Sequence, residues 1–177
     1  SPIDEFNLNL YSPFSYKKTY SNAIETIGAK SVPVVIAENP IAGELAPDFI
    51  VDANNGRLTQ NASDIAYLEV TDVDDLAQLS LMDKQTVLVL STKNTNIHAA
   101  LRSLRLRIFA LGIKNPVIFK LSYNDSDIER FMIKASMDAG ILFLDGLGDG
   151  LWLQNPEIEI GTCVNTCPVR RAARASR

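Results

Sequence analysis

The sequence predicts an α/β fold: a mostly parallel sheet with flanking helices, the sheet being either open or closed into an incomplete barrel. Short runs rich in Val, Ile, Leu and Phe alternate with amphipathic helical patterns through the interior of the chain. Four of these runs are nearly continuous in apolar residues, which is typical of strands covered on both faces. Strand and helix patterns alternate across residues 86–144, and this order predicts parallel pairing through right-handed crossovers.

The expected strands are short apolar runs. They occupy residues 32–37, 48–51, 66–70, 86–91, 116–121 and 141–144, and a further strand is expected at 151–153. Pro33 and Pro116 stand at strand starts, where a missing N–H group is tolerated. Outside the run at 48–51, residues 39–63 are rich in Pro, Gly, Asn and Asp, so no full helix is expected there.

Three helices are expected between the strands, at residues 72–81, 96–111 and 125–139. The first begins with an acidic cluster, which the helix dipole favours; the cluster consists of Asp72, Asp74 and Asp75. The second has the strongest pattern, with an apolar stripe made of Ile97, Leu101, Leu104, Ile108 and Leu111. Gly112 and Gly140 follow the second and third patterns and are expected to end those helices.

Length, composition and charge limit the classes of function. The 177 residues suit one globular domain, and the net charge of −4 is uneven. Residues 168–177 hold four arginines and no acid, so residues 1–167 carry a net charge of −8. An acidic body repels phosphate backbones, which argues against nucleic-acid binding. No apolar run approaches the roughly 20 residues of a membrane span, and no signal-peptide pattern is visible, so a cytoplasmic location is expected.

The two ends differ in pattern from the interior. Residues 1–6 and 161–177 are expected to be cloning remnants or a disordered tail, and residues 7–160 to form a single α/β domain. Cys163 and Cys167 fall in this tail with C-x3-C spacing. A zinc or iron–sulfur site needs about four ligands, and the remaining ligands are not supplied. No metal site is therefore expected.

The most informative segment is the glycine loop at residues 145–150, whose candidate binding residues are Asp145, Gly146, Gly148, Asp149 and Gly150. Closely spaced glycines imply a sharp turn, positive φ or close approach of another group. Carboxylates and N–H groups at the end of a parallel strand could bind a metal or a phosphate, because α/β proteins gather ligands there. The alternative is a tight strand-to-strand connection with structural glycines and turn-capping aspartates. The connection is favoured, since no helix pattern follows the loop.

Other chemically capable side chains stand alone. His98 is the only histidine, and no serine or cysteine motif lies near it. It is expected to be a solvated or half-buried helix residue rather than part of a catalytic dyad. The same helix is expected to present a solvated arginine face, formed by Arg102, Arg105 and Arg107. We therefore expect no catalytic residue and no metal ligand in this chain.

Several segments resemble one enzyme family. Residues 115–118 (Asn-Pro-Val-Ile), 127–130 (Asp-Ile-Glu-Arg) and 139–150 follow one another with characteristic spacing. They are similar to the segment just upstream of the iron–sulfur domain in the large, three-domain form of 4-hydroxy-3-methylbut-2-enyl diphosphate synthase, an enzyme of the non-mevalonate isoprenoid pathway. Residues 32–37 also resemble the central insert domain of that family.

The resemblance implies that the chain is the insert domain of a bacterial, cytoplasmic enzyme. The complete enzyme would have an N-terminal (β/α)8 barrel for the substrate and a C-terminal domain with a four-iron–four-sulfur cluster, held by three cysteines and a glutamate. The cluster reductively opens 2-C-methyl-D-erythritol 2,4-cyclodiphosphate, with ferredoxin or flavodoxin as the electron donor. The family's Cys-x-x-Cys motif followed by Gly-Arg is absent from this chain, so no catalytic residue carries over.

The family's catalytic barrel contains a Glu-Gly-Ile-Gly-Asp-Thr string similar to residues 145–150. This likeness implies that the insert is a degenerate copy of that barrel, with a TIM-barrel-like fold. The resulting interpretation is a domain that is inactive alone and spaces the other domains of the enzyme, which are its partners. Two alternatives are a module that binds a small molecule or metal–phosphate at the 145–150 loop, and an α/β enzyme of unknown reaction.

Overall fold

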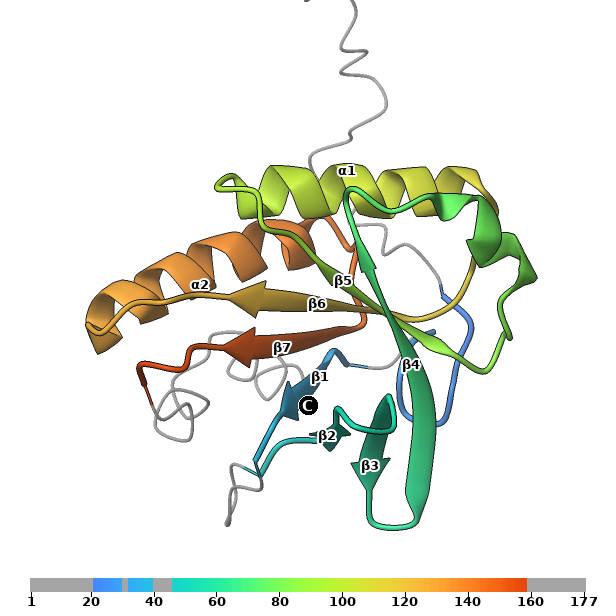
Figure 1. Cartoon of the computed structure of the whole chain (residues 1–177), viewed down its shortest axis with the longest axis horizontal. Helices are drawn as coiled ribbons and strands as arrows, with labels where there is room; N and C mark the ends of the chain where they lie inside the picture. The colour runs from blue at the N-terminus through green and yellow to red at the C-terminus, as the bar shows by residue number, and fades with distance from the viewer. Residues whose placement is uncertain (1–20, 30–31, 40–45, 159–177) are drawn as a thin grey trace, which may run out of the picture.

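The computed structural model describes residues 21–29, 32–39 and 46–158 and shows a closed barrel of seven strands, with two α-helices together on one side (Figure 1). The strands follow one another around the barrel in chain order, and β7 pairs with β1. The strands are β1 (Val34–Ala37), β2 (Phe49–Asp52), β3 (Arg57–Gln60), β4 (Ser63–Thr71), β5 (Val87–Ser91), β6 (Val117–Ser122) and β7 (Gly150–Gln154). The helices are α1 (Ile97–Ala110) and α2 (Ile128–Leu144), and a 3₁₀ helix (Leu76–Leu81) precedes β5.

The expected α/β fold, with a mostly parallel or TIM-barrel-like sheet, is wrong: the barrel is mixed. β3 pairs antiparallel with both β2 and β4, while the other neighbouring strands pair in parallel. The physical reason is that turns, not helices, join β2 to β3 and β3 to β4, and parallel strands need a crossover of a dozen residues or more. Asp52 shapes the first turn by accepting hydrogen bonds from the N–H groups of Asn54 and Asn55. Asn61, at φ 51°, lies in the second turn.

The parallel pairing expected between residues 86–91 and 116–121 is confirmed, since β5 and β6 are parallel neighbours with α1 between them. Two cores share these strands. In β5, Val87 and Val89 pack inside the barrel, whereas Leu88 and Leu90 pack beneath the helices. This burial on both faces explains the continuous apolar runs that the sequence shows.

The helix α2 is longer than the sequence predicts, and residues 141–144 are its last turn, not a strand. It begins after Asp127, whose carboxylate caps the first turn, and it continues through Gly140. Leu142 is fully buried, while Leu144 is 77% exposed. Burial on one side only is the pattern of a surface helix, because its side chains repeat about every 3.6 residues. The strand expected at 151–153 is confirmed as part of β7.

The segment expected as a helix at 72–81 is only in part helical. Asp75 caps the 3₁₀ helix by accepting a hydrogen bond from the N–H of Ala77. Asp74 accepts a hydrogen bond from the backbone of Thr71, and Asp72 accepts one from the Thr92 hydroxyl. The acidic cluster therefore shapes the connection between β4 and β5.

Candidate functional site

The glycine loop at residues 145–150 joins α2 to β7, so it is a helix-to-strand connection and not the expected strand-to-strand connection. Gly146 has φ 67°, the left-handed conformation common directly after a helix. Its N–H donates to the carbonyl of Phe143 (3.0 Å), and the N–H of Leu147 donates to the carbonyl of Leu142 (3.2 Å). This pair of hydrogen bonds is a Schellman motif, which satisfies carbonyls left open at a helix end.

Asp149 fastens the start of β7 between β6 and β1. Its carboxylate Oδ2 accepts a hydrogen bond from the N–H of Val117 (3.0 Å), and its own N–H donates to the Val117 carbonyl (2.7 Å). The carbonyl of Asp149 accepts a hydrogen bond from the N–H of Val34 (3.0 Å). The residue is 2% exposed. The carboxylate is therefore committed to the backbone of the neighbouring strand.

The other two glycines of the loop are required by close packing. A Cβ atom at Gly148 would lie 2.5 Å from Phe119 Cε2, and one at Gly150 would lie 2.7 Å from Val34 Cγ2. Neither glycine has positive φ. Space, and not backbone conformation, demands glycine at these two positions.

Arg105 is buried, so the expected solvated arginine face of α1 is wrong at this position. Its side chain Nε donates to the carbonyl of Leu147 (3.0 Å), and the residue is 1% exposed. Burial lowers the pKa of Arg105, and the nearby charge of Asp149 opposes that shift. Arg102 forms an ion pair with Asp145 (Nε to Oδ2, 3.3 Å). Two arginines of α1 therefore hold the glycine loop.

The described residues form no cluster of side chains that could bind a metal ion. Within 21–29, 32–39 and 46–158, no three His, Cys, Asp or Glu side chains are placed to hold one ion. Residues 1–6 and residues 161–177, which include Cys163 and Cys167, lie outside this part of the chain.

A second polar cluster lies at the carboxyl ends of the parallel strands, the edge at which α/β sheets bind ligands. We call it the mouth cluster; its members are Glu38, Glu69, Ser91, Lys120, Ser122 and Gln154. The hydroxyl of Ser122 donates to Gln154 Oε1 (3.0 Å), and Gln154 Nε2 donates to Glu38 Oε1 (2.8 Å). These hydrogen bonds link β6, β7 and the end of β1.

Lys120 forms the ion pair of the mouth cluster. Its Nζ lies 3.2 Å and 3.1 Å from the two carboxylate oxygens of Glu69, which also accepts a hydrogen bond from Ser91. The same Nζ lies 4.4 Å from the ring centroid of Trp152, a cation–π contact. Tyr67 meets that ring edge-on, with centroids 6.1 Å apart. The lysine ammonium thus lies between a carboxylate and the face of an aromatic ring.

The electrostatics of the mouth disfavour an anion. Burial raises the pKa of Tyr67, and the carboxylates of Glu69, Asp52 and Glu38 raise it further. Tyr67 therefore stays neutral, and Lys120 is the cation of a cluster with two glutamates. A phosphate group at this edge would face uncompensated carboxylate charge.

Sequence reasoning misses the mouth cluster because each member is an ordinary surface residue type. The sequence signal that could have found the cluster is the alternation of side chains between the two faces of each strand, which repeats every two residues. In β6, Ile118, Lys120 and Ser122 share one face and change from apolar to polar toward the carboxyl end. The same change repeated in several strands would have predicted a shared polar edge.

His98 belongs to a separate contact between the helices. Its Nδ1 lies 3.2 Å from Asp138 Oδ1, and the hydroxyl of Tyr123 donates to Asp138 Oδ2 (2.8 Å). The side chain of His98 is 38% exposed on α1, so the expectation of a solvated or half-buried helix residue is confirmed. Burial raises the pKa of Tyr123, and the hydrogen bond to Asp138 raises it further. The three residues connect α1, α2 and the end of β6.

Comparison with known proteins finds no matching family model and no matching solved structure. Curated relatives do match. A 4-hydroxy-3-methylbut-2-en-1-yl diphosphate synthase (flavodoxin) of Parabacteroides distasonis is 32% identical over 95 residues, which cover 54% of this chain and 15% of the relative. The enzyme of the same name from Porphyromonas gingivalis is 28% identical over 137 residues, 72% of this chain and 24% of the relative. The resemblance to the synthase family is confirmed.

The chain corresponds to a segment of these synthases and not to their whole length. Against the enzyme of Bacteroides thetaiotaomicron, 26% identity extends over 189 aligned residues, 83% of this chain and 30% of the relative. Across these three relatives, the chain spans between 15% and 30% of the length of the enzyme. Among the described helices, none has the length and hydropathy needed to cross a membrane.

Proposed function

We propose that this chain is a structural segment of a 4-hydroxy-3-methylbut-2-en-1-yl diphosphate synthase and that it spaces the domains that carry out the reaction. One observation carries the proposal: the match to the synthases of Porphyromonas gingivalis and Bacteroides thetaiotaomicron extends over most of this chain but over at most 30% of each enzyme. Such a match is what an inserted domain produces.

The geometry of both candidate sites supports a role without catalytic residues. In the glycine loop, Asp149 is buried against the backbone of β6, and Asp145 pairs with Arg102. In the mouth cluster, Lys120 and Glu69 satisfy each other. Polar groups that are already hydrogen-bonded within the fold gain little by binding a substrate.

The activity proposed for the whole enzyme follows from the family. It is the conversion of 2-C-methyl-D-erythritol 2,4-cyclodiphosphate to 4-hydroxy-3-methylbut-2-enyl diphosphate at a four-iron–four-sulfur cluster held by another domain, in the bacterial cytoplasm. The names of the relatives specify flavodoxin, so we propose flavodoxin as the reductant.

The test is a segment exchange in the Porphyromonas gingivalis synthase. Three proteins are assayed for turnover of the cyclodiphosphate: the synthase with its matched segment replaced by this chain, the synthase with that segment deleted, and this chain alone. We expect turnover by the exchange protein and none by the other two. Turnover by this chain alone, or full activity of the deletion protein, would contradict the spacer role.

A further inference from the structure

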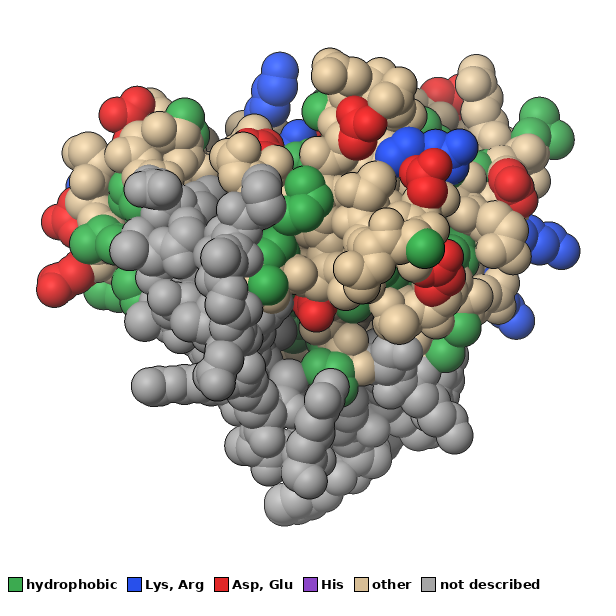
Figure 2. All heavy atoms as spheres, turned by 90° about the horizontal axis from the view of Figure 1, so that it is seen from below, with side chains coloured by type: hydrophobic (Ala, Val, Ile, Leu, Met, Phe, Trp, Pro, Cys, Tyr) green, Lys and Arg blue, Asp and Glu red, His purple; other side chains and the backbone are tan. Residues whose placement is uncertain are grey.

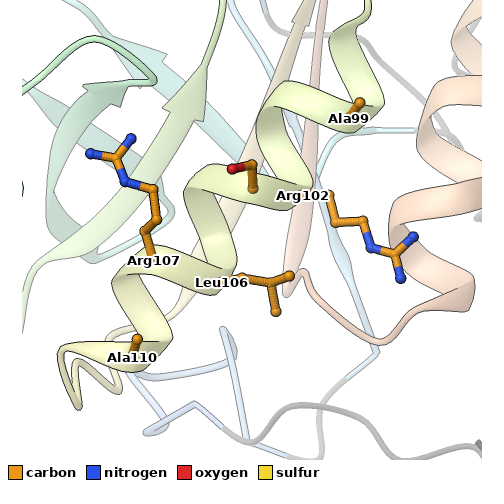
Figure 3. A pocket seen from close by; sticks show the side chains of 6 residues that line it. Ala99, Arg102, Leu106, Arg107 and Ala110 are labelled. Atoms are coloured by element: carbon orange, nitrogen blue, oxygen red, sulfur yellow. The ribbon is translucent and has the colours of Figure 1, made fainter. Parts of the chain in front are cut away.

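The helix α1 has one face that the barrel does not use. Its buried side packs on the sheet through Leu101, Leu104 and Ile108. Its outer side carries an open groove of about 500 Å³, which we call the α1 groove (Figure 3). The groove is lined by Ala99, Arg102, Ser103, Leu106, Arg107 and Ala110.

The shape of the α1 groove suits a second helix. Ala99, Ser103, Leu106 and Ala110 recur at spacings of four, three and four residues, which is the seam spacing of two helices that cross at about 20°. Three of the four side chains are small, so a partner helix can approach closely. The seam is about 16 Å long at 1.5 Å per residue, which matches three turns of a partner helix. Leu106 is 49% exposed at its centre.

The charge of α1 selects an acidic partner. The helix holds no acid, and two of its three arginines, Arg102 and Arg107, line the groove, although the chain has a net charge of −4. Figure 3 shows Arg102 and Arg107 directed to opposite sides of the seam. Arg102 pairs with Asp145, whereas Arg107 forms no ion pair with a described residue and donates to the carbonyl of Asp72 (3.2 Å). On the face seen in Figure 2, by contrast, acidic and basic side chains are both scattered among neutral ones.

We propose that the α1 groove docks an amphipathic helix with acidic flanking residues, contributed by the part of the synthase polypeptide outside this chain. This inference rests on the proposed function. The chain spans 30% of the Bacteroides thetaiotaomicron synthase, so most of such a polypeptide is available to supply the helix. Apolar side chains of that helix would cover Leu106, and a carboxylate would pair with Arg107.

The experiment measures whether the groove is covered in the assembled enzyme. Ser103→Cys reports on the groove, and Ala62→Cys, in the exposed turn between β3 and β4, is the matched control. Both are made with Cys163→Ser and Cys167→Ser, in this chain and in the segment-exchange synthase. The rate of maleimide labelling at each site is followed by peptide mass spectrometry. We expect labelling at position 103 to slow about tenfold in the exchange protein, equivalent to about 1.4 kcal/mol of docking, and labelling at position 62 to stay unchanged.

The charge of the partner is tested by a second pair of variants in the exchange protein. Arg107→Glu should restore fast labelling at position 103, because it would repel an acidic helix. Arg130→Glu, at an exposed position on α2, is the control and should leave the labelling slow. Slow labelling that survives Arg107→Glu would overturn the acidic character of the partner.

Other outcomes overturn the docking proposal itself. Equal labelling rates at position 103 in the isolated chain and in the exchange protein would show that nothing covers the groove. Slower labelling at both position 103 and position 62 would show a general effect rather than docking. Labelling of the isolated chain that slows as its concentration rises would mean that a second copy is the occupant. Cyclodiphosphate turnover separates the two proposals, since an active exchange protein with fast labelling leaves the spacer role intact. If the exchange protein does not fold, the deletion synthase is added to this chain in trans, and unprotected position 103 again overturns the proposal.

Discussion

Where α1, α2 and β7 meet, single side chains hold separate elements together. Arg105 reaches from α1 to the carbonyl of Leu147, just beyond the end of α2, and Asp149 fixes the start of β7 to β6. A charge removed from water must be paired or hydrogen-bonded, because its desolvation costs several kcal/mol. The arginines of α1 look equivalent in the sequence, and only the tertiary structure shows that Arg105 is enclosed. A helical pattern with Arg105 beside the apolar stripe gives no sign of this contact.

The first prediction compares two arginines. Arg105→Ala should lower the free energy of unfolding by about 3–5 kcal/mol, because it leaves the Leu147 carbonyl without its donor and Asp149 without its cationic neighbour. Arg102→Ala removes a partly exposed ion pair with Asp145 and should cost less than about 1 kcal/mol. Urea denaturation followed by circular dichroism measures both. Equal, small losses would show that Arg105 is solvated in solution.

The second prediction compares two glycines. Gly148→Ala should destabilise the chain by about 1–3 kcal/mol, since the added methyl group would collide with the Phe119 ring. Gly140→Ala places a methyl group on α2 with nothing within 4 Å and should stabilise the chain by about 0.5–1 kcal/mol. Thermal unfolding of the two variants should therefore show opposite shifts of Tm. A neutral Gly148→Ala would refute the tight packing of the loop.

At the scale of elements, the spacing of apolar residues predicts a helix that is buried along one stripe and a strand that is buried on both faces. α1 and the parallel pair of β5 and β6 follow from their apolar patterns. Residues 141–144 mislead because a short apolar run fits the end of a helix as well as a strand. β3 is missed because its four residues lie among turn-forming residues. The period of two along the strands can predict a polar edge, but the pairing partners within the mouth cluster depend on the register of several strands, which one sequence does not disclose.

The third prediction concerns the connection of α2 to the end of β6. The partly buried hydroxyl of Tyr123 donates to Asp138, and its pKa is raised above the ordinary value of 10.0. An unfolded tyrosine loses its proton near pH 10, whereas folded Tyr123 keeps it. The stability that this group contributes is therefore complete below about pH 10 and is lost as the pH rises above that value.

Urea denaturation between pH 8 and pH 11 tests this dependence. Tyr123→Phe should be less stable than the original chain at pH 8, because the hydrogen bond to Asp138 is absent. Its stability should fall less steeply above pH 10, because position 123 no longer titrates. Parallel profiles for the two proteins would show that Tyr123 titrates normally.

At the scale of the whole molecule, the barrel is a scaffold built around two hydrophobic cores. One core fills the barrel, and a second lies between the sheet and the two helices. At the carboxyl edge of the parallel strands, Lys120 contacts both Glu69 and Trp152. An edge whose charged groups pair with each other supports the proposed spacer role, and the outer face of α1 is the surface proposed for docking.

The most direct test of the spacer role is the kcat of the segment-exchange synthase carrying Lys120→Met together with Glu69→Gln. The double substitution removes the charges of the mouth cluster's ion pair, while thermal unfolding verifies that the protein remains folded. We predict a kcat close to that of the unsubstituted exchange protein. A fall of about 100-fold or more, the loss typical of a missing acid–base group, would contradict the spacer role and place catalytic chemistry in this barrel.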